Sequence, residues 1–152
     1  MTVLLLGGPP LTREDVIAVS REGRPVALDP AARIRMQASR AVVVQYAASA
    51  RPVYGVNTGF GGLSDHWVPG PERLRLQLNL IRSHASAVGD PLPRPLVRAM
   101  MVLRAQGLAQ GRSGVRPDLV EALVAWLNAG VTPVVPGPAR WGLPATSPFG
   151  AS

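Results

Sequence analysis

The sequence of 152 residues contains no cysteine and no lysine, few aromatic residues, and no long apolar run. Without cysteine the chain forms neither a disulfide nor a thiolate metal site, and a cytoplasmic location is the default expectation. No stretch approaches the roughly 18 consecutive apolar residues of a membrane span, so we expect no membrane partner. The apolar run at residues 3–6 is too short for a signal peptide and follows no basic segment, so we expect a strand there.

All the counted positive charge is carried by arginine, and the formal net charge is +7. Nucleic-acid binding would account for such a charge. The arginines are spread singly over helix-like stretches with little aromatic interleaving, so we expect no nucleic-acid partner. A coding sequence rich in G and C explains the bias more simply. The two histidines form no HExxH motif or ligand cluster, so we expect no metal site.

Five segments carry helical periodicity, and several are bounded by capping residues. Thr12 followed by Asp15 resembles a capping box, and Asp29 before Pro30 is a typical N-cap. Glycine stands at the end of most of these segments, where it favours a helix stop. The predicted helices lie within residues 11–23, 29–49, 71–89, 93–111 and 116–130.

Two short strands, at residues 2–6 and 25–28, are predicted to pair as an N-terminal β-hairpin. With five helices and no βαβ alternation, the predicted fold class is mainly α. The last three helices are apolar on more than one face, which is typical of a bundle covered by further helices or subunits. After residue 136 the chain becomes rich in proline and glycine and loses periodicity. We therefore predict a helical segment over 1–136 and an irregular tail over 137–152.

A glycine-rich stretch, VYGVNTGFGG at residues 53–62, lies between two predicted helices. It has neither the GxGxxG nor the GxxxxGK[ST] spacing, and no strand precedes it, so it does not match a phosphate-binding loop. Two interpretations remain: a bland surface loop, or an active-site lid with glycine hinges that presents Tyr54. A phenol with the ordinary pKa of about 10 serves as a base only where its anion is stabilised.

Two further positions carry candidate chemistry. His84 follows Ser83 in an otherwise apolar predicted helix, where a lone histidine is either a buried structural residue or a catalytic group. The turn around Ser113 either binds an anion at the start of the next helix or is simply a tight interhelix turn. Composition and periodicity therefore lead to a helical domain with one conspicuous loop.

Four stretches taken together resemble the aromatic amino acid ammonia-lyase family, most closely its histidine ammonia-lyase members. The resemblance covers roughly residues 3–136 and implies the N-terminal part of an all-α fold that associates into a homotetramer. It also implies non-oxidative deamination of L-histidine to urocanate and ammonia, at active sites built from more than one subunit. The stretches are YGVNTGFGGL, LQLNLIRSHASAVG, RAMMVLRAQGLAQGRSGVR and ALVAWLNAGVTPVVP.

The resemblance assigns roles to individual residues. Tyr54 is the expected base, and Gly61 matches a position where the backbone passes close to the substrate. Asn57 is assigned to substrate binding with the same motif. Ser83 and His84 resemble the pair of the histidine enzymes, with His84 hydrogen-bonded to the substrate imidazole. The alternatives are a tyrosine or phenylalanine ammonia-lyase or aminomutase and, from another class, a non-enzymatic helical oligomerisation module.

The tail departs from the family where its prosthetic group forms. In the family, methylidene-imidazolone arises by autocatalytic cyclisation of Ala-Ser-Gly within Gly-Ser-Val-Gly-Ala-Ser-Gly-Asp-Leu-Ala, whereas this chain has ARWGLPATSP at residues 139–148. Codons for these ten residues, when translated one base earlier, permit all ten family residues. We therefore predict a reading-frame change near Gly137–Pro138, which leaves the chain without an intact triad and inactive alone. The competing interpretation takes Gly150-Ala151-Ser152 as the start of the triad after an insertion.

Overall fold

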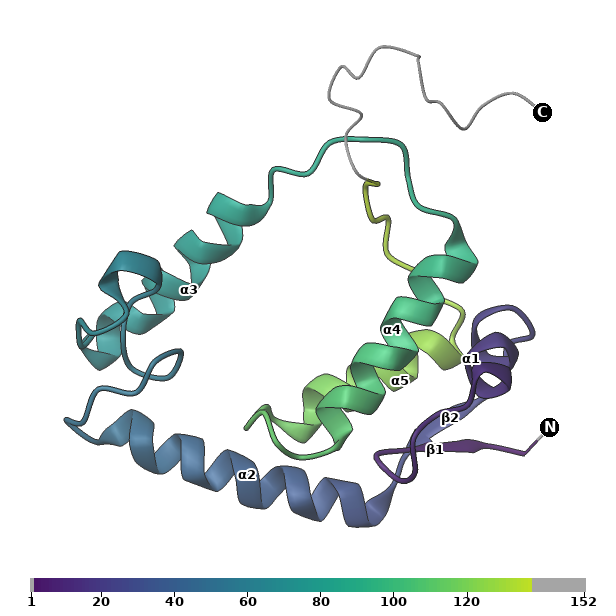
Figure 1. Ribbon diagram of the computed structural model, residues 1–152, viewed down its shortest axis with the longest axis horizontal. Helices are drawn as coiled ribbons and strands as arrows, with labels where there is room; N and C mark the ends of the chain where they lie inside the picture. Colours follow the sequence, from purple (N-terminus) through teal and green to yellow (C-terminus); the bar gives the residue numbers. More distant parts are fainter. Residues whose placement is uncertain (1, 138–152) are drawn as a thin grey trace, which may run out of the picture.

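The computed structural model describes residues 2–137, and the fold of this part is mainly helical, as predicted (Figure 1). The predicted reading-frame change and irregular tail concern residues that, apart from Gly137, lie outside the described part of the chain. The chain also forms a short 3-10 helix, which is labelled η1 below. The elements in chain order are β1 (Leu4–Leu6), α1 (Arg13–Ser20), β2 (Val26–Leu28), α2 (Pro30–Ala48), η1 (Gly61–Leu63), α3 (Gly70–His84), α4 (Arg94–Ala109) and α5 (Pro117–Asn128).

The two strands do not form the predicted hairpin. β1 and β2 pair in parallel, with Leu4 opposite Val26 and Leu6 opposite Leu28. A hairpin needs only a tight turn, whereas parallel neighbours need a crossover, and α1 supplies it here. The expectation of no βαβ alternation is therefore wrong for this one unit. The direction of β2 depends on how α1 packs, which the strand sequences do not encode.

Local capping signals determine where the first two long elements begin. In the capping box of α1, the Asp15 N–H donates to Thr12 Oγ1 and the Thr12 N–H donates to Asp15 Oδ2, each at 3.1 Å. At the start of α2, Asp29 Oδ1 accepts from the Ala31 N–H at 2.7 Å, and Pro30 occupies the first turn. These contacts satisfy backbone donors that a helix start leaves unpaired. Both capping predictions are confirmed.

The core lies where α1, α4 and α5 pack against the small sheet (Figure 1). α2 joins it only through its amino-terminal half, with Ala32 and Met36 buried, and then extends away from it. α4 contributes the largest share of the core, and its buried face also holds two polar side chains, Arg98 and Gln106. The clustered core side chains are Leu6, Val19, Val26, Met36, Val97, Met101, Val102, Ala105, Leu108, Ala109, Val120 and Leu127.

α3 stands apart from this core (Figure 1). None of its residues is buried, and its apolar side chains Leu74 and Ile81 are exposed to 81% and 66%. The helix was expected to continue toward Gly89, but it ends at His84. Residues 85–88, which follow it, are all exposed.

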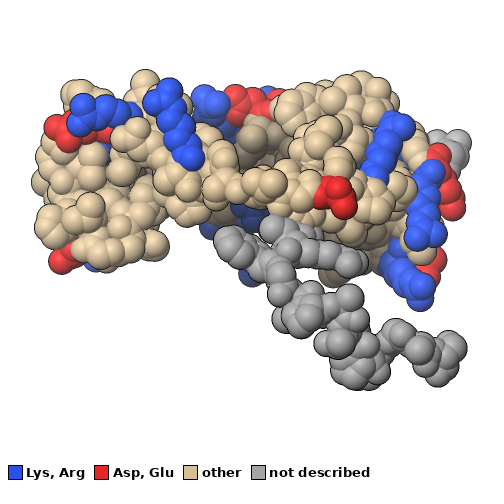
Figure 2. Space-filling model, turned by 90° about the horizontal axis from the view of Figure 1, so that it is seen from above, with Lys and Arg blue, Asp and Glu red and all other residues tan. Residues whose placement is uncertain are grey.

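Charge is dispersed over the surface. On the face in Figure 2, arginine side chains lie singly or in small groups among uncharged residues, several of them beside acidic ones. Ion pairs at 2.7 Å join Arg24 to Asp15 and Arg33 to Glu121. Within residues 2–137, no helix has both the length and the hydropathy to cross a bilayer.

Candidate active-site loop

The glycine-rich loop follows α2 and folds back on itself. Thr58 and Trp67 form an antiparallel bridge, and the Val68 N–H donates to Asn57 O at 2.8 Å. η1 closes the far end of this short ladder. The base of the loop is thus anchored by backbone pairing, and Thr58 and Gly59 within it are buried.

Three loop glycines have a structural reason to be glycine. Gly55 and Gly61 adopt φ of +74° and +60°, a region that residues with a Cβ rarely occupy. At buried Gly59, a Cβ would lie 2.7 Å from both Cβ and the carbonyl oxygen of Leu63. These residues shape the loop, and the motion of a lid stays a prediction.

Tyr54 lies at the outer edge of this loop, in a tight turn. The Val56 N–H donates to Val53 O at 3.0 Å, with Gly55 at the third position of the turn. The Tyr54 side chain is 64% exposed, and its ring meets Phe60 edge-on at 6.2 Å between centroids. Among the described residues, no hydrogen bond involves its hydroxyl group. The phenol is therefore presented outward from an anchored base.

Asn57 is the most buried side chain of the loop, at 1% exposure. Its Oδ1 accepts from the Val53 N–H at 2.7 Å. Its Nδ2 lies 3.1, 3.3 and 2.9 Å from the carbonyl oxygens of Tyr46, Ser49 and Arg51. An amide nitrogen has two hydrogens, so three acceptors occupy both of them. The predicted substrate contact by Asn57 finds no free donor in this arrangement.

Ser83 and His84 lie at the carboxyl end of α3 and are exposed. The Ser83 hydroxyl donates to Leu80 O at 2.9 Å, and His84 Nδ1 lies 2.9 Å from the same oxygen. A proton on Nδ1 makes this second contact a hydrogen bond and leaves Nε2 of the neutral ring as an outward acceptor. His84 is exposed in the described part of the chain, so no described residue buries it in a core, and both interpretations of this histidine stay predictions.

Arg73, in the first turns of α3, ties the loop to two helices. Its Nε donates to Val68 O at 2.8 Å, and its guanidinium lies 5.8 Å from the Trp67 ring centroid. It also donates to Ala47 O, in the last turn of α2. His84 lies three turns further along α3, roughly 16 Å by helix geometry. The structure thus groups Tyr54, Asn57 and Gly61 in one loop and places Ser83 beside His84, but no described contact joins the tyrosine to the histidine.

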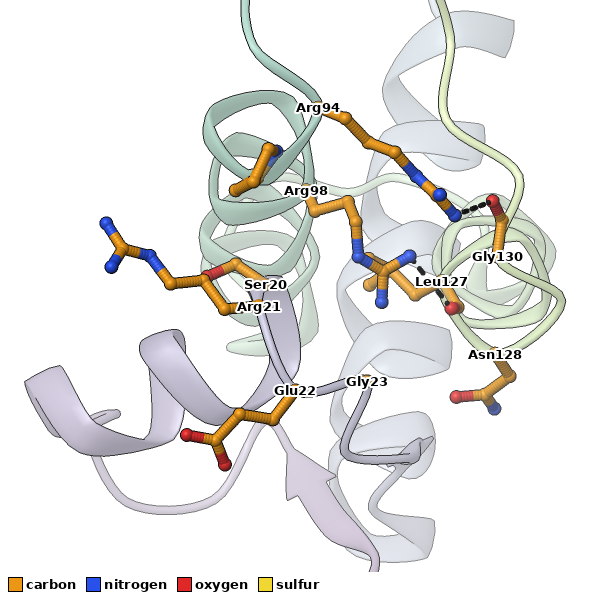
Figure 3. Close-up of a pocket in the computed structure, with 10 residues that line it drawn as sticks. Ser20, Arg21, Glu22, Gly23, Arg94, Arg98, Leu127, Asn128 and Gly130 are labelled. Atoms are coloured by element: carbon orange, nitrogen blue, oxygen red, sulfur yellow. Dashed lines mark hydrogen bonds between the residues drawn. The ribbon is translucent and has the colours of Figure 1, made fainter.

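A cavity of about 350 Å³ lies elsewhere, between the carboxyl ends of α1 and α5 and the start of α4 (Figure 3). None of the predicted site residues lines it. Arg98, only 6% exposed, donates to Leu127 O and Val19 O at 3.1 and 3.0 Å, and Arg94 donates to Gly130 O at 2.7 Å. Sequence analysis assigned no role to any of these residues.

The charge of Arg98 is balanced by helix ends. Burial lowers the pKa of Arg98, and the neighbouring Arg94 lowers it further. A guanidinium nevertheless stays protonated near neutral pH. The two carbonyl oxygens that it binds belong to the last turns of α1 and α5, where the helix dipoles carry partial negative charge. Arg98 therefore acts as a structural clamp between two helices.

The chain has the fold of solved ammonia-lyases and aminomutases. The tyrosine aminomutase of Streptomyces globisporus superposes with a TM-score of 0.83 at 35% identity, over 89% of this chain and 26% of that chain. The histidine ammonia-lyase of Trypanosoma cruzi gives 0.79 at 37% identity, over 89% of this chain and 26% of that one.

Sequence comparison gives the family. The family model described as aromatic amino acid lyase matches residues 11–141. A histidine ammonia-lyase of Symbiobacterium thermophilum is 48% identical over 129 residues, which are 85% of this chain and 25% of that protein. The chain belongs to the aromatic amino acid lyase family, a family of carbon–nitrogen lyases, and the predicted resemblance is confirmed. It spans about a quarter of the length of the curated relatives that it matches.

The prosthetic group implied by this family does not fit the described residues. Methylidene-imidazolone forms from Ala-Ser-Gly, and residues 2–137 contain no such tripeptide. No segment within residues 2–137 can therefore form the group.

Proposed function

We propose that this chain supplies the base-bearing segment of an enzyme that deaminates L-histidine to urocanate and ammonia. The observation that carries the proposal is the exposed phenol of Tyr54, held outward from an anchored loop base. Relatives named histidine ammonia-lyase, at 43–48% identity over most of the chain, support the choice of substrate. A tyrosine or phenylalanine enzyme is the alternative within the family.

Tyr54 in its phenolate form would accept the β-proton of the substrate. As that C–H bond breaks, its electron pair forms the new carbon–carbon double bond, and the C–N pair leaves with the amine. The proton is then on the Tyr54 oxygen, so charge and atoms balance. A base must come within about 3 Å of the proton that it removes, and an outward, exposed phenol has the freedom to do so.

His84 is proposed to select the substrate ring. With Nδ1 engaged by Leu80 O, its Nε2 accepts a hydrogen bond from an imidazole N–H. A phenyl ring offers no such donor, so this acceptor would be left unpaired with phenylalanine. Ser83 supports the arrangement, because its hydroxyl lies 3.0 Å from His84 Nδ1. The backbone at Gly61, which has open space around it, is proposed to pass close to the substrate.

We also propose that the intact enzyme is a cytoplasmic homotetramer with composite active sites. The exposed apolar side chains along α3 support this, because a stripe of Leu74, Leu78 and Ile81 needs a covering partner. The absence of cysteine from the sequence agrees with a reducing compartment.

We propose that the Ala-Ser-Gly needed for the prosthetic group is encoded in a different reading frame from the one that this chain follows after Gly137. The ten-residue codon match one base earlier supports a single-base shift. Resequencing the coding DNA around codon 137 tests it: the shifted frame should encode Gly-Ser-Val-Gly-Ala-Ser-Gly-Asp-Leu-Ala. An unbroken frame through this region, with no such decapeptide one base away, would contradict the shift.

A chimeric enzyme tests the activity. Residues 2–136 of this chain would replace the matching segment of the Symbiobacterium thermophilum histidine ammonia-lyase. The chimera should form urocanate, followed by its ultraviolet absorbance, and should prefer histidine to tyrosine and phenylalanine. The 152-residue chain alone should form none. A folded chimera that turns over tyrosine or phenylalanine but not histidine would overturn the choice of substrate, and a folded chimera with no turnover would overturn the function.

A further inference from the structure

Asn57 closes a small ring of hydrogen bonds around Tyr54. The Val53 N–H donates to Asn57 Oδ1 at 2.7 Å, and the Asn57 N–H donates to Val53 O at 3.1 Å. Both backbone groups of Val53 are thereby bound to one residue. Only Tyr54, Gly55 and Val56 lie between the two ends of the ring, so the direction of the Tyr54 side chain follows from where Asn57 sits.

The same side chain connects this ring to the rest of the fold. Asn57 Nδ2 lies within hydrogen-bond distance of Tyr46 O, in the last turn of α2, and of Ser49 O, at the carboxyl-terminal cap of that helix. The other end of α2 is fixed in the core through Ala32 and Met36. Since a helix is a stiff element, Asn57 transmits the position of the core to the turn that carries the tyrosine.

These contacts give the Asn57 side chain a structural role, which binding to a substrate would not explain. A residue at 1% exposure with four backbone partners cannot turn toward a ligand without leaving buried backbone groups unpaired. Its backbone carbonyl is also engaged, by the Val68 N–H at 2.8 Å. Every polar group of Asn57 therefore faces the loop base.

We propose that Asn57 is a positioning residue, whose side-chain amide fixes the turn that presents Tyr54 and does not touch the substrate. This inference rests on the proposed role of Tyr54 as the base. Truncation of Asn57 should therefore lower the rate of the proton transfer and leave substrate binding intact. A misplacement of about 1 Å at a reacting group reduces turnover about a hundredfold.

The chain offers a matched control in Asn128. Its Oδ1 accepts from the Val26 N–H and its Nδ2 donates to Val26 O, both at 2.9 Å. Asn128 thus also uses its side-chain amide to bind backbone, but it lies in the core region at the end of α5. Asn57→Ala and Asn128→Ala both remove such an amide, and only the first acts on the loop.

The first measurement uses the 152-residue chain and needs no turnover. Amide hydrogen exchange, followed by NMR, should accelerate about tenfold at Val53 in Asn57→Ala and stay unchanged there in Asn128→Ala. The ring contact between Tyr54 and Phe60 should weaken only in Asn57→Ala. Unchanged exchange at Val53 in Asn57→Ala would overturn the inference, whatever the enzyme does.

The second measurement uses the chimera. Asn57→Ala should lower kcat about a hundredfold with KM within a factor of about two, the pattern expected when only the transition state is affected. Asn128→Ala should leave both constants near those of the parent. Equal kcat in the two variants, or a loss confined to KM, would overturn the positioning role. If the parent chimera is inactive, the proposed function fails, and exchange at Val53 still decides whether Asn57 fixes the turn.

Discussion

Replacing Arg98 by methionine should destabilise the chain strongly. Methionine keeps an apolar stem but leaves Val19 O and Leu127 O without the donor that binds them at 3.0 and 3.1 Å. Hydrogen bonds from a charged group contribute about 1.5–3 kcal/mol each, and the cost of burying the cation offsets part of their sum. We expect a net loss of about 3 kcal/mol, a large share of a typical stability of about 5–15 kcal/mol.

Urea unfolding followed by circular dichroism measures this loss. Arg104→Met is the matched control, because Arg104 lies exposed on the same helix, and its loss should stay within about 0.5 kcal/mol. Arg98→Lys should fall between the two, since one ammonium cannot reproduce the spread of a guanidinium. In a thermal scan, Arg98→Met should lower Tm by roughly 6–12 °C. A loss equal to that of Arg104→Met would refute the clamp between α1 and α5.

Three further predictions concern the loop, the first helix and the substrate ring. Gly61→Ala should lower the free energy of unfolding by about 1 kcal/mol, because φ at Gly61 is positive, and should raise KM for histidine in the chimera. Gly62→Ala is the control and should change neither quantity, so equal effects of the two substitutions would contradict the prediction. Hydrogen bonds from the Thr12 N–H and hydroxyl hold the pKa of Asp15 below its ordinary value of 3.8. The stability that the ionised carboxylate adds to the folded chain is therefore present above pH 3.8, and it is lost as the pH falls through the lowered pKa of the folded state. Asp15→Asn should therefore flatten the acid limb of the stability curve in denaturation at graded pH, and an unaltered limb would count against the capping box. His84→Leu should raise KM for histidine and shift the substrate preference toward tyrosine or phenylalanine in competition assays. An unchanged preference would rule out the proposed contact between His84 and the substrate ring.

Helix positions followed from local signals, and strand direction did not. The caps at Thr12 and Asp29 act over three residues, so the sequence alone locates those helix starts. The parallel pairing of β1 with β2 depends on the path of α1 and on the packing of β1 against α4 and of β2 against α5, both distant in the sequence.

The sequence predicted which residues carry the chemistry of the site, but not the contacts that hold them in place. The Tyr54 motif stands out by its glycines, but nothing in the sequence shows that the Asn57 amide turns inward to four backbone groups. The sequence contains a weak indication that Arg73 packs against the rest of the chain, because it shares a helix face with Leu76 and Leu80, three and seven residues further along. Arg98 had none, since its partners are carbonyl oxygens at the ends of helices that are remote in sequence.

The central claim is that Tyr54 removes the proton, and urocanate formation by the chimera tests it most directly. Tyr54→Phe keeps the ring and deletes the hydroxyl, and Tyr46→Phe, at the only other tyrosine, is the control. We expect Tyr54→Phe to lose at least about a hundredfold in kcat, the usual contribution of a general base, and Tyr46→Phe to retain the parent rate. Turnover by Tyr54→Phe at the rate of Tyr46→Phe would contradict the claim.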